Sequence, residues 1–238
     1  MPNPTAAMLV IGDEILSGRT RDANMYHLAG RLAELGIDLN EVRVVADHAD
    51  DIVAALNALR NRYDNVFTSG GIGPTHDDIT ADCVARAFGV DIGVREDARQ
   101  ILATNYPDGE AALNPARLRM ARIPDGARLI ENPVSKAPGF SLENVHVLAG
   151  VPNVFKAMVE SILPTLTGGA ALISESVRID RGESDVAEAL GMIDARYPQV
   201  GIGSYPFQRD GRFGTNIVLR SADRTALDAA ANDVRALI

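Results

Sequence analysis

The stretch Asn65-Val-Phe-Thr-Ser-Gly-Gly-Ile-Gly-Pro-Thr-His-Asp-Asp-Ile-Thr80 decides the fold, because an apolar strand runs directly into a glycine-rich turn and then into a helix. We expect the strand over Asn65–Thr68 and the helix over Ile79–Phe88. Repeated strand–turn–helix order predicts an α/β fold, with a parallel sheet, right-handed crossovers and helices on both faces. Two earlier segments have this order, with strands expected at Ala6–Ile11 and Val42–Ala46 and helices at 22–36 and Asp50–Arg62.

The pattern changes at Gly168-Gly169, which we interpret as a hinge between two domains, residues 1–168 and 169–238. Before the hinge we expect a helix-rich stretch, one more strand of the sheet and a closing helix. Beyond it, the order strand, helix, strand, strand, helix predicts a small α+β domain. The elements before the hinge are Glu96–Ile130, Val145–Ala149 and Val151–Leu166, and those beyond it are Ser176–Ile179, Ser184–Tyr197, Val200–Phe207, Thr215–Leu219 and Arg224–Ile238, with a hairpin turn at Asp210-Gly211.

Composition excludes several classes of function. The 238 residues carry 23 basic and 32 acidic side chains, a formal charge of −9 and no basic run, so nucleic acid is not an expected partner. The single cysteine excludes an intramolecular disulfide and a multi-cysteine zinc site. No apolar run approaches the roughly 20 residues that span a bilayer, and the first residues lack a secretory signal. We expect a cytoplasmic protein without a membrane partner, and we attribute its many arginines to coding bias rather than to phosphate recognition.

Three loops that follow predicted strands are expected to meet at one edge of the sheet, because open parallel sheets bind ligands beyond the carboxyl ends of their strands. They are Gly12-Asp-Glu14, Ser69–Asp78 and Gly150-Val-Pro152. Glycine lets backbone N–H groups approach an anion closely, so Ser69–Asp78 is a candidate phosphate cradle. Thr80 is placed to cap the following helix, whose N-terminus adds further N–H donors. The alternative is a tight strand-to-helix turn without a ligand.

Acidic residues gather in two of these loops. Asp13, Glu14, Asp77 and Asp78 should lie at neighbouring loop tips, where carboxylates repel one another unless a divalent cation lies between them. A cation beside a phosphate polarises phosphoryl oxygen and activates water, which predicts metal-assisted attack on a phosphoanhydride. In the alternative interpretation, Asp77 and Asp78 only interact with the dipole of the following helix.

Four further features have competing interpretations. His76, next to the acids, is a candidate ligand or general base, or a solvated loop histidine. Lys136 stands between two loop prolines, where it can reach a phosphate as a point charge or lie free on the surface. Cys83 falls inside a predicted helix, which favours a packed thiol over a nucleophile. Gly211-Arg-Phe-Gly214 is similar to the GxxG loop of KH domains, but its place in a predicted hairpin favours an ordinary turn.

Four ordered motifs spread over about 140 residues resemble a known family. They are Gly12-Asp-Glu-Ile-Leu-Ser-Gly18, Thr68 to Thr80, Asn132-Pro-Val to Ala137-Pro-Gly-Phe140, and Leu148-Ala-Gly-Val-Pro152. Together they resemble the N-terminal molybdopterin-binding-like domain of the competence/damage-inducible protein CinA, which is related to MoaB, MogA and the amino-terminal half of eukaryotic FAD synthase. The tail resembles the small KH-like domain that follows in CinA, with Glu183-Ser-Asp185 and Arg196-Tyr-Pro198 in fitting places. The sequence ends before the nicotinamide-nucleotide amidase domain of CinA, so deamidation is not expected.

The resemblance implies a three-layer αβα domain with a parallel-rich sheet, followed by a KH-like α+β domain. It implies a pocket for a pterin or nucleotide phosphate, and a pyrophosphatase dependent on Mg²⁺, Mn²⁺ or Co²⁺, with ADP-ribose as the first candidate substrate and FAD as the second. The alternatives are a module that binds molybdopterin or a nucleotide without hydrolysis, and an oligomeric scaffold; we expect a homo-oligomer. Together with the loops, the resemblance assigns three sets of site residues. Those expected to bind phosphate are Gly12, Ser69, Gly70, Gly71, Gly73, Thr80, Lys136 and Gly150. Those expected to bind the metal are Asp13, Glu14 and Asp78, and those expected to act in catalysis are His76, Asp77 and Asp78.

Overall fold

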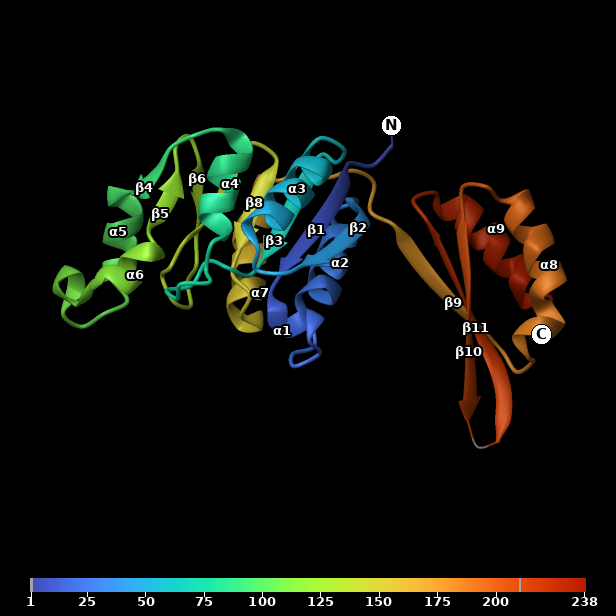
Figure 1. Cartoon of the computed structure of the whole chain (residues 1–238). Helices are drawn as coiled ribbons and strands as arrows, with labels where there is room; N and C mark the ends of the chain where they lie inside the picture. Colours follow the sequence, from blue (N-terminus) through green and yellow to red (C-terminus); the bar gives the residue numbers. More distant parts are fainter. Residues whose placement is uncertain (1, 210) are drawn as a thin grey trace. The chain divides into compact units, whose positions relative to one another are not determined.

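The computed structural model describes residues 2–209 and 211–238. Contacts divide the chain into two compact units, Met1–Gly169 and Ala170–Ile238 (Figure 1). We call these the first and the second unit and describe each by itself. The hairpin turn predicted at Asp210-Gly211 lies partly outside the described residues, because Asp210 is not among them.

The first unit contains a six-stranded sheet in the order β2-β1-β3-β8-β7-β6. Neighbouring strands from β2 to β8 are parallel, whereas β7 and β6 continue the sheet with antiparallel pairing. The α/β prediction with a parallel-rich sheet is therefore confirmed. The strands are β1 Thr5–Ile11, β2 Asp38–Val45, β3 Asn65–Ser69, β6 Arg128–Ile130, β7 Gly139–Leu142 and β8 Val145–Leu148.

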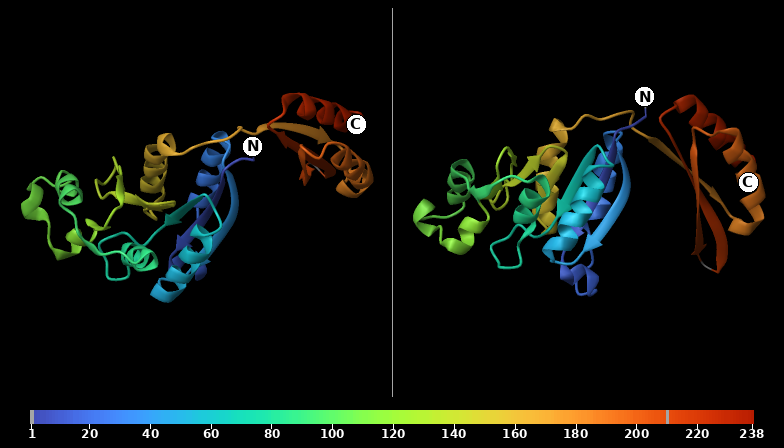
Figure 2. Two further views of the ribbon diagram at one scale, coloured as in Figure 1. Left: turned by 90° about the horizontal axis from the view of Figure 1, so that it is seen from above. Right: turned by 45° about the horizontal axis from the view of Figure 1, so that its top comes forward.

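Helices cover both faces of this sheet and make the domain three-layered. Alternate residues of β1 point to opposite faces, so that Leu9 joins the core formed with α3 and α4, while Met8 joins the core formed with α2 and α7. In the left view of Figure 2, α2 and α7 lie on one side of the sheet and α3 and α4 on the other. The helices are α2 Asn24–Glu34, α3 Ala49–Arg60, α4 Thr80–Phe88 and α7 Pro152–Ile162, which continues into a 3₁₀ turn, η2 Leu163–Thr165.

The segment between α4 and β8 differs most from the expected pattern. It was expected to be rich in helix, but it also contains short strands, two of which, β4 and β5, form a separate antiparallel pair. Strands of three or four residues are too short to show the alternation by which a strand is predicted. The elements are β4 Ile92–Val94, α5 Glu96–Ala103, η1 Gly109–Ala112, α6 Pro115–Arg119 and β5 Arg122–Pro124; a further short helix, α1 Asp13–Leu16, follows β1.

The second unit has the predicted order of strand, helix, strand, strand and helix. Its antiparallel sheet has the order β10-β11-β9, and Ile217 and Leu219 of β11 pack against Leu227 and Val234 of the last helix. That helix is capped by Asp223, whose carboxylate accepts hydrogen bonds from two N–H groups of its first turn. The elements are β9 Ile173–Ile179, α8 Glu183–Arg196, β10 Gly201–Arg209, β11 Arg212–Ser221 and α9 Arg224–Arg235.

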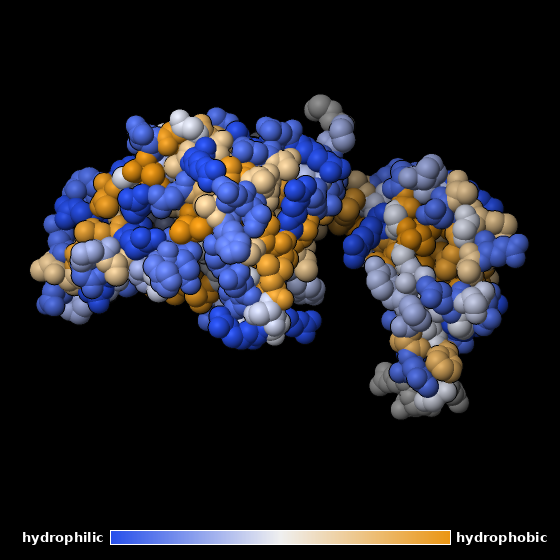
Figure 3. Space-filling view, viewed as in Figure 1, coloured by the Kyte–Doolittle hydropathy of each residue, from blue (hydrophilic) through white to orange (hydrophobic). Residues whose placement is uncertain are grey.

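The face seen in Figure 3 is mostly hydrophilic, with hydrophobic residues exposed singly or in small groups. Tyr26 in the first unit and Phe213 in the second are examples of large exposed side chains. Among residues 2–209 and 211–238, the structure has no helix with the length and apolar character needed to cross a membrane.

His146 of β8 lies in a buried polar network inside the sheet. Its Nδ1 is 2.9 Å from the hydroxyl of Ser141, and its Nε2 is 3.3 Å from Oδ1 of Asn65. With the amide oxygen of Asn65 as acceptor, Nε2 carries the proton and Nδ1 accepts from Ser141. Burial, followed by the charge of Arg128, lowers the pKa of His146 to about 4. The imidazole therefore stays neutral in the folded protein near pH 7.

We predict that acid destabilises the fold through His146. Below the ordinary histidine pKa near 6.5, the unfolded chain binds a proton that the folded protein does not, so the free energy of unfolding falls until the pH reaches about 4. For this one group the loss between pH 7 and pH 5 is about 2 kcal/mol. Urea unfolding gives the free energy of unfolding of the wild type and of His146→Gln at pH 7 and pH 5. The wild type should lose about 2 kcal/mol more than the variant between these pH values. Equal pH dependence in the two proteins would show that His146 does not resist protonation.

Candidate functional site

The carboxyl ends of β1, β3 and β8 meet at one edge of the sheet, as predicted for their loops. Gly70, directly after β3, lies so close to β1 that a Cβ atom there would be 2.3 Å from the carbonyl oxygen of Ile11. Gly150, which follows β8, packs against Gly70, and a Cβ atom at Gly150 would be 3.2 Å from the Gly70 Cα. Close approach of the backbone therefore requires glycine at position 70, whereas the contact at Gly150 is tight but less severe.

Asn24, at the start of α2, links two of these loops. It is 3% exposed, and its Nδ2 donates to the hydroxyl oxygen of Ser69 at 2.8 Å and to the carbonyl oxygen of Gly150 at 2.7 Å. Because a carbonyl oxygen can only accept, this pair of bonds fixes the orientation of the amide. The predicted site residue Ser69 is itself buried, so in this structure its side chain supports the loops through Asn24.

The glycine loop presents unpartnered N–H groups. Among the described residues, the N–H groups of Gly71, Ile72 and Gly73 have no acceptor in the protein. Gly70 and Gly71 have φ values of 107° and 68°, in the region that favours glycine. Consecutive N–H groups in such a turn form a concave binding site for an oxyanion.

Thr80 holds this loop in place. The sequence predicted that its side chain would cap the helix, and the structure shows that it does not. It is the first residue of α4, one position beyond the N-cap, Ile79. Its hydroxyl donates to the carbonyl oxygen of Gly70, and its N–H donates to the carbonyl oxygen of Gly71, both at 2.9 Å. These bonds hold the carbonyl groups of Gly70 and Gly71, while the N–H groups of Gly71, Ile72 and Gly73 remain available to a ligand.

Asp47, after β2, is the functional candidate that the sequence reasoning missed. Its Oδ2 accepts from the N–H of Asp13 at 2.9 Å, and it lies within electrostatic reach of Glu14 and Asp77. Burial, together with the negative charges of Asp13, Glu14 and Asp77, raises the pKa of Asp47 above its ordinary value, although the hydrogen bond from Asp13 opposes this. The signal was available, because Asp47 follows a predicted parallel strand just as Asp13 does.

Asp77 and Asp78 differ in what they contact. Oδ2 of Asp78 accepts from the N–H and the hydroxyl of Thr75, at 2.8 and 2.5 Å, so this carboxylate stabilises the turn. The pKa of Asp77 is lowered, first by hydrogen bonding in the turn at Thr75 and, among smaller causes, by the charges of His76 and Arg119. His76 is exposed.

These loops enclose a cavity of about 560 Å³. Eight of the predicted site residues line it: Gly12, Glu14, Gly70, Gly71, Gly73, Asp77, Asp78 and Gly150. Five do not: Asp13, Ser69, His76, Thr80 and Lys136. Residues that the sequence reasoning did not select also line it, among them Thr20, Asp47, Met120, Asn132 and Ser135.

Lys136 belongs to the loop that borders this cavity, but its side chain is not part of the wall. The carboxamide of Asn132 accepts from the N–H groups of Val134 and Ser135, and the N–H of Lys136 donates to the carbonyl of Asn132. Lys136 itself has a left-handed backbone, with φ 59°. In the same unit Cys83 is buried, and burial raises the pKa of its thiol to about 11, which agrees with a packed side chain rather than a nucleophile.

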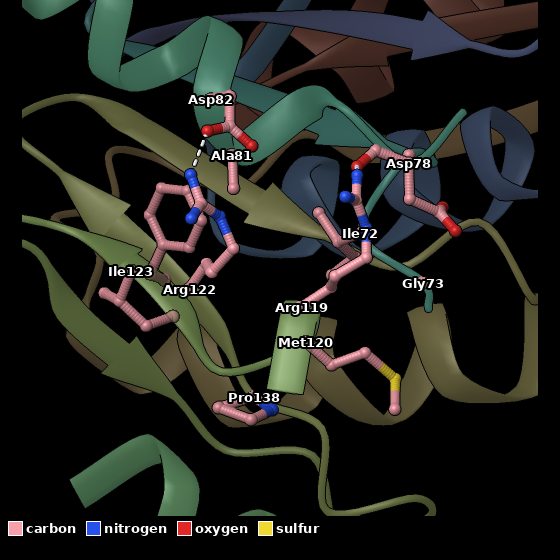
Figure 4. Close-up of a pocket in the computed structure, with 12 residues that line it drawn as sticks. Ile72, Gly73, Asp78, Ala81, Asp82, Arg119, Met120, Arg122, Ile123 and Pro138 are labelled. Atoms are coloured by element: carbon pink, nitrogen blue, oxygen red, sulfur yellow. Dashed lines mark hydrogen bonds and ion pairs between the residues drawn. The ribbon is translucent and has the colours of Figure 1, made fainter. Parts of the chain in front are cut away.

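A smaller cavity lies next to the glycine loop and shares Gly71, Gly73 and Asp78 with the larger one. Figure 4 shows two arginines on its wall. Arg122 forms an ion pair with Asp82, whereas Arg119 extends to Asp78, where its Nη2 donates to the main-chain oxygen at 3.1 Å. Nothing in the sequence distinguishes Arg119 from the other arginines in this way.

The carboxylates suit a divalent cation that also binds the ligand. Within the described part of the chain, no three His, Cys, Asp or Glu side chains are close enough to form a complete metal site. Asp47, however, is surrounded by the charges of Asp13, Glu14 and Asp77, which raise its pKa and which a cation would offset. Mg²⁺ is commonly held by one or two carboxylates together with substrate phosphates. Asp47, Glu14 and Asp77, which line the cavity, fit that mode of binding.

The fold and the cavity define an αβα protein with a candidate ligand site at the carboxyl edge of its parallel strands. A family model described as "Probable molybdopterin binding domain" matches residues 7–168, and one described as "FAD synthase, middle domain" matches residues 171–238. The chain belongs to the molybdopterin-binding domain family. The KH-like character expected for the tail is not tested by this match and stays a prediction.

Individual relatives agree with this family. A CinA-like protein of Myxococcus xanthus is 35% identical over 82% of this chain, and a probable FAD synthase of Caenorhabditis elegans is 30% identical over 98% of it. The chain spans 50% of the length of each of these two relatives. The crystal structure of CinA from Thermoplasma acidophilum, whose title describes its function as unknown, matches with a TM-score of 0.64 and 36% identity, over 68% of this chain and 97% of that one.

Proposed function

We propose that the first unit binds a nucleotide or pterin phosphate in the 560 Å³ cavity and hydrolyses a phosphoanhydride, with ADP-ribose as the first candidate substrate and FAD as the second. One observation carries the proposal: Gly71, Ile72 and Gly73, whose N–H groups have no acceptor among the described residues, line a cavity that Asp47 and Asp77 also line. Donors for an oxyanion beside carboxylates are the groups that phosphoanhydride hydrolysis requires.

In this reaction a water oxygen forms a bond to one phosphorus as the bridging P–O bond breaks. ADP-ribose gives AMP and ribose 5-phosphate, and FAD gives AMP and FMN. The glycine-loop N–H groups bind the phosphate oxygens, and Asp77 accepts the proton of the attacking water. Glu14 and Asp47 would hold a divalent cation, which would offset the negative charge of the phosphates.

The relatives support a nucleotide as the ligand but do not decide between the two substrates. The second unit matches the FAD synthase middle domain, and the C. elegans relative named as a probable FAD synthase aligns with almost the whole chain. These matches keep FAD in the comparison beside ADP-ribose, so both compounds belong in the first assay.

The test is product formation by the purified protein. ADP-ribose and FAD are each incubated with Mg²⁺, Mn²⁺ or Co²⁺, and AMP is measured by chromatography. We expect AMP with at least one metal and none after addition of EDTA. Asp50→Asn, which removes an exposed carboxylate of α3 that pairs with Arg86, is the matched control and should retain full activity. If no mixture yields AMP, the hydrolase proposal is wrong.

A binding module without hydrolysis is the second candidate. It is favoured by the family's description as a probable molybdopterin-binding domain and by the lack, among the described residues, of a complete metal site. Calorimetry with a pterin phosphate in the presence of EDTA tests it. Tight binding without metal and without turnover would support this candidate against the hydrolase.

A further inference from the structure

Arg119 is placed beside the candidate phosphate cradle by a short, well-anchored helix. The helix α6 begins at Pro115 and is capped by Asn114, whose side chain accepts from the N–H of Arg117. Arg119 is its last residue and lies on the wall of the smaller cavity, together with Gly71 and Gly73 of the glycine loop. The same two glycines line the larger cavity, so the cavity that Arg119 lines adjoins the proposed ligand site at the glycine loop.

The charge of Arg119 is not neutralised by a neighbouring carboxylate. Its one hydrogen bond to the protein is the bond from Nη2 to the main-chain oxygen of Asp78, and its buried Nε has no acceptor among the described residues. The buried Nε of Arg122, on the same cavity wall, also lacks an acceptor among the described residues, but the guanidinium of Arg122 is paired with Asp82. A buried donor without an acceptor is costly, so an arginine left in this state calls for a partner that the protein alone does not provide.

The effect of Arg119 extends into the larger cavity. It is one of the positive charges that lower the pKa of Asp77, after the larger contribution of hydrogen bonding in the Thr75 turn. Asp77 lines the larger cavity, so the field of Arg119 is present where the ligand is expected. In a chain of net charge −9, with carboxylates around the site, a local cation is what makes the approach of an anion favourable.

We propose that Arg119 is a ligand-binding residue whose guanidinium binds an oxyanion, a phosphate of the ligand that the glycine loop also holds. A planar guanidinium offers paired N–H donors that match two phosphate oxygens. The inference rests on the phosphate-binding part of the proposed function and does not depend on hydrolysis. For this residue, the proposal departs from the attribution of the arginines to coding bias.

Calorimetry tests the proposal with ADP-ribose and inorganic pyrophosphate as probes, in EDTA and again with Mg²⁺. Arg119→Gln should raise the Kd of both probes at least tenfold, and Arg119→Lys, which keeps the charge but loses the paired donors, should have an intermediate effect. The affinity of Arg119→Gln should also depend less on KCl concentration than that of the wild type. Arg117→Gln is the matched control. Arg117 lies in the same helix as Arg119, stacks on Tyr106 and lines neither cavity.

The controls separate this proposal from a structural role and from the proposed function. Thermal unfolding establishes that each variant is folded, and Arg117→Gln should bind both probes within twofold of the wild type. The proposal is wrong if Arg119→Gln binds within twofold of the wild type, if Arg117→Gln weakens binding as much, or if the wild type binds neither probe. A third result is possible: the wild type binds ADP-ribose without hydrolysing it, and Arg119→Gln loses affinity. This result supports the role of Arg119 and refutes only the hydrolase proposal.

Discussion

Gly70→Ala is expected to destabilise the first unit by about 3 kcal/mol or more and to abolish ligand binding. Its backbone has φ 107°, and an added Cβ would be 2.3 Å from the carbonyl oxygen of Ile11. The backbone of β1 cannot move away, because β1 is buried in the centre of the sheet and paired on both sides. The loop must therefore shift, which displaces the N–H groups of the next three residues.

Gly89→Ala is the matched control for this variant. Gly89 also has a left-handed backbone, with φ 67° at the end of α4, but a Cβ there would meet no atom within 4 Å. Backbone strain alone costs about 1 kcal/mol in that conformation. Urea unfolding and calorimetric binding of ADP-ribose measure both variants. If Gly70→Ala is no less stable than Gly89→Ala, the end of β3 does not approach the Ile11 carbonyl of β1 closely enough to exclude a Cβ atom.

Asp47→Asn is expected to lower kcat/KM for phosphoanhydride hydrolysis roughly 100-fold or more while leaving the protein at least as stable as the wild type. The folded protein raises the pKa of Asp47, so its charged form is disfavoured near neutral pH and removal of the charge relieves the repulsion. The asparagine retains an oxygen to accept from the N–H of Asp13. An inactive variant without loss of stability indicates a residue kept for function.

The measurements for Asp47→Asn are steady-state kinetics over a range of Mg²⁺ concentrations and the free energy of unfolding in EDTA. Asp50→Asn again provides the control, because it removes an equal charge from an exposed position in the same unit. Activity of Asp47→Asn within threefold of the wild type would remove Asp47 from the site, and a large loss of stability would show that its role is structural.

Long elements of the fold could be predicted because their patterns are strong. The buried run of β1 and the amphipathic helices α2 and α3 follow from hydrophobicity alone, and the parallel order follows from their alternation. The pair β4 and β5 and the antiparallel end of the sheet could not be predicted in this way. Their strands contain three or four residues, and partners distant in sequence determine their pairing.

The site could be predicted as a region but not in every residue. The rule that parallel strands bind ligands at their carboxyl ends located Gly70, Gly71 and Gly150. The same rule, applied to β2, would have found Asp47. The prediction that Thr80 caps the helix was wrong. Thr80 lies one residue inside the helix, where its hydroxyl points at Gly70 rather than at the first turn. Arg119 could not be found, since only the folded chain shows that no carboxylate of the described residues pairs with it.

Amide chemical shifts of the isotope-labelled protein, recorded during titration with ADP-ribose in EDTA, test most directly whether this cavity binds the phosphate. The largest changes should fall on the N–H groups of Gly71, Ile72 and Gly73, followed by Gly150. Changes concentrated instead around Asn65, Asn144 and His146, which line a separate cavity, with the glycine loop unaffected, would contradict the assignment of the ligand site.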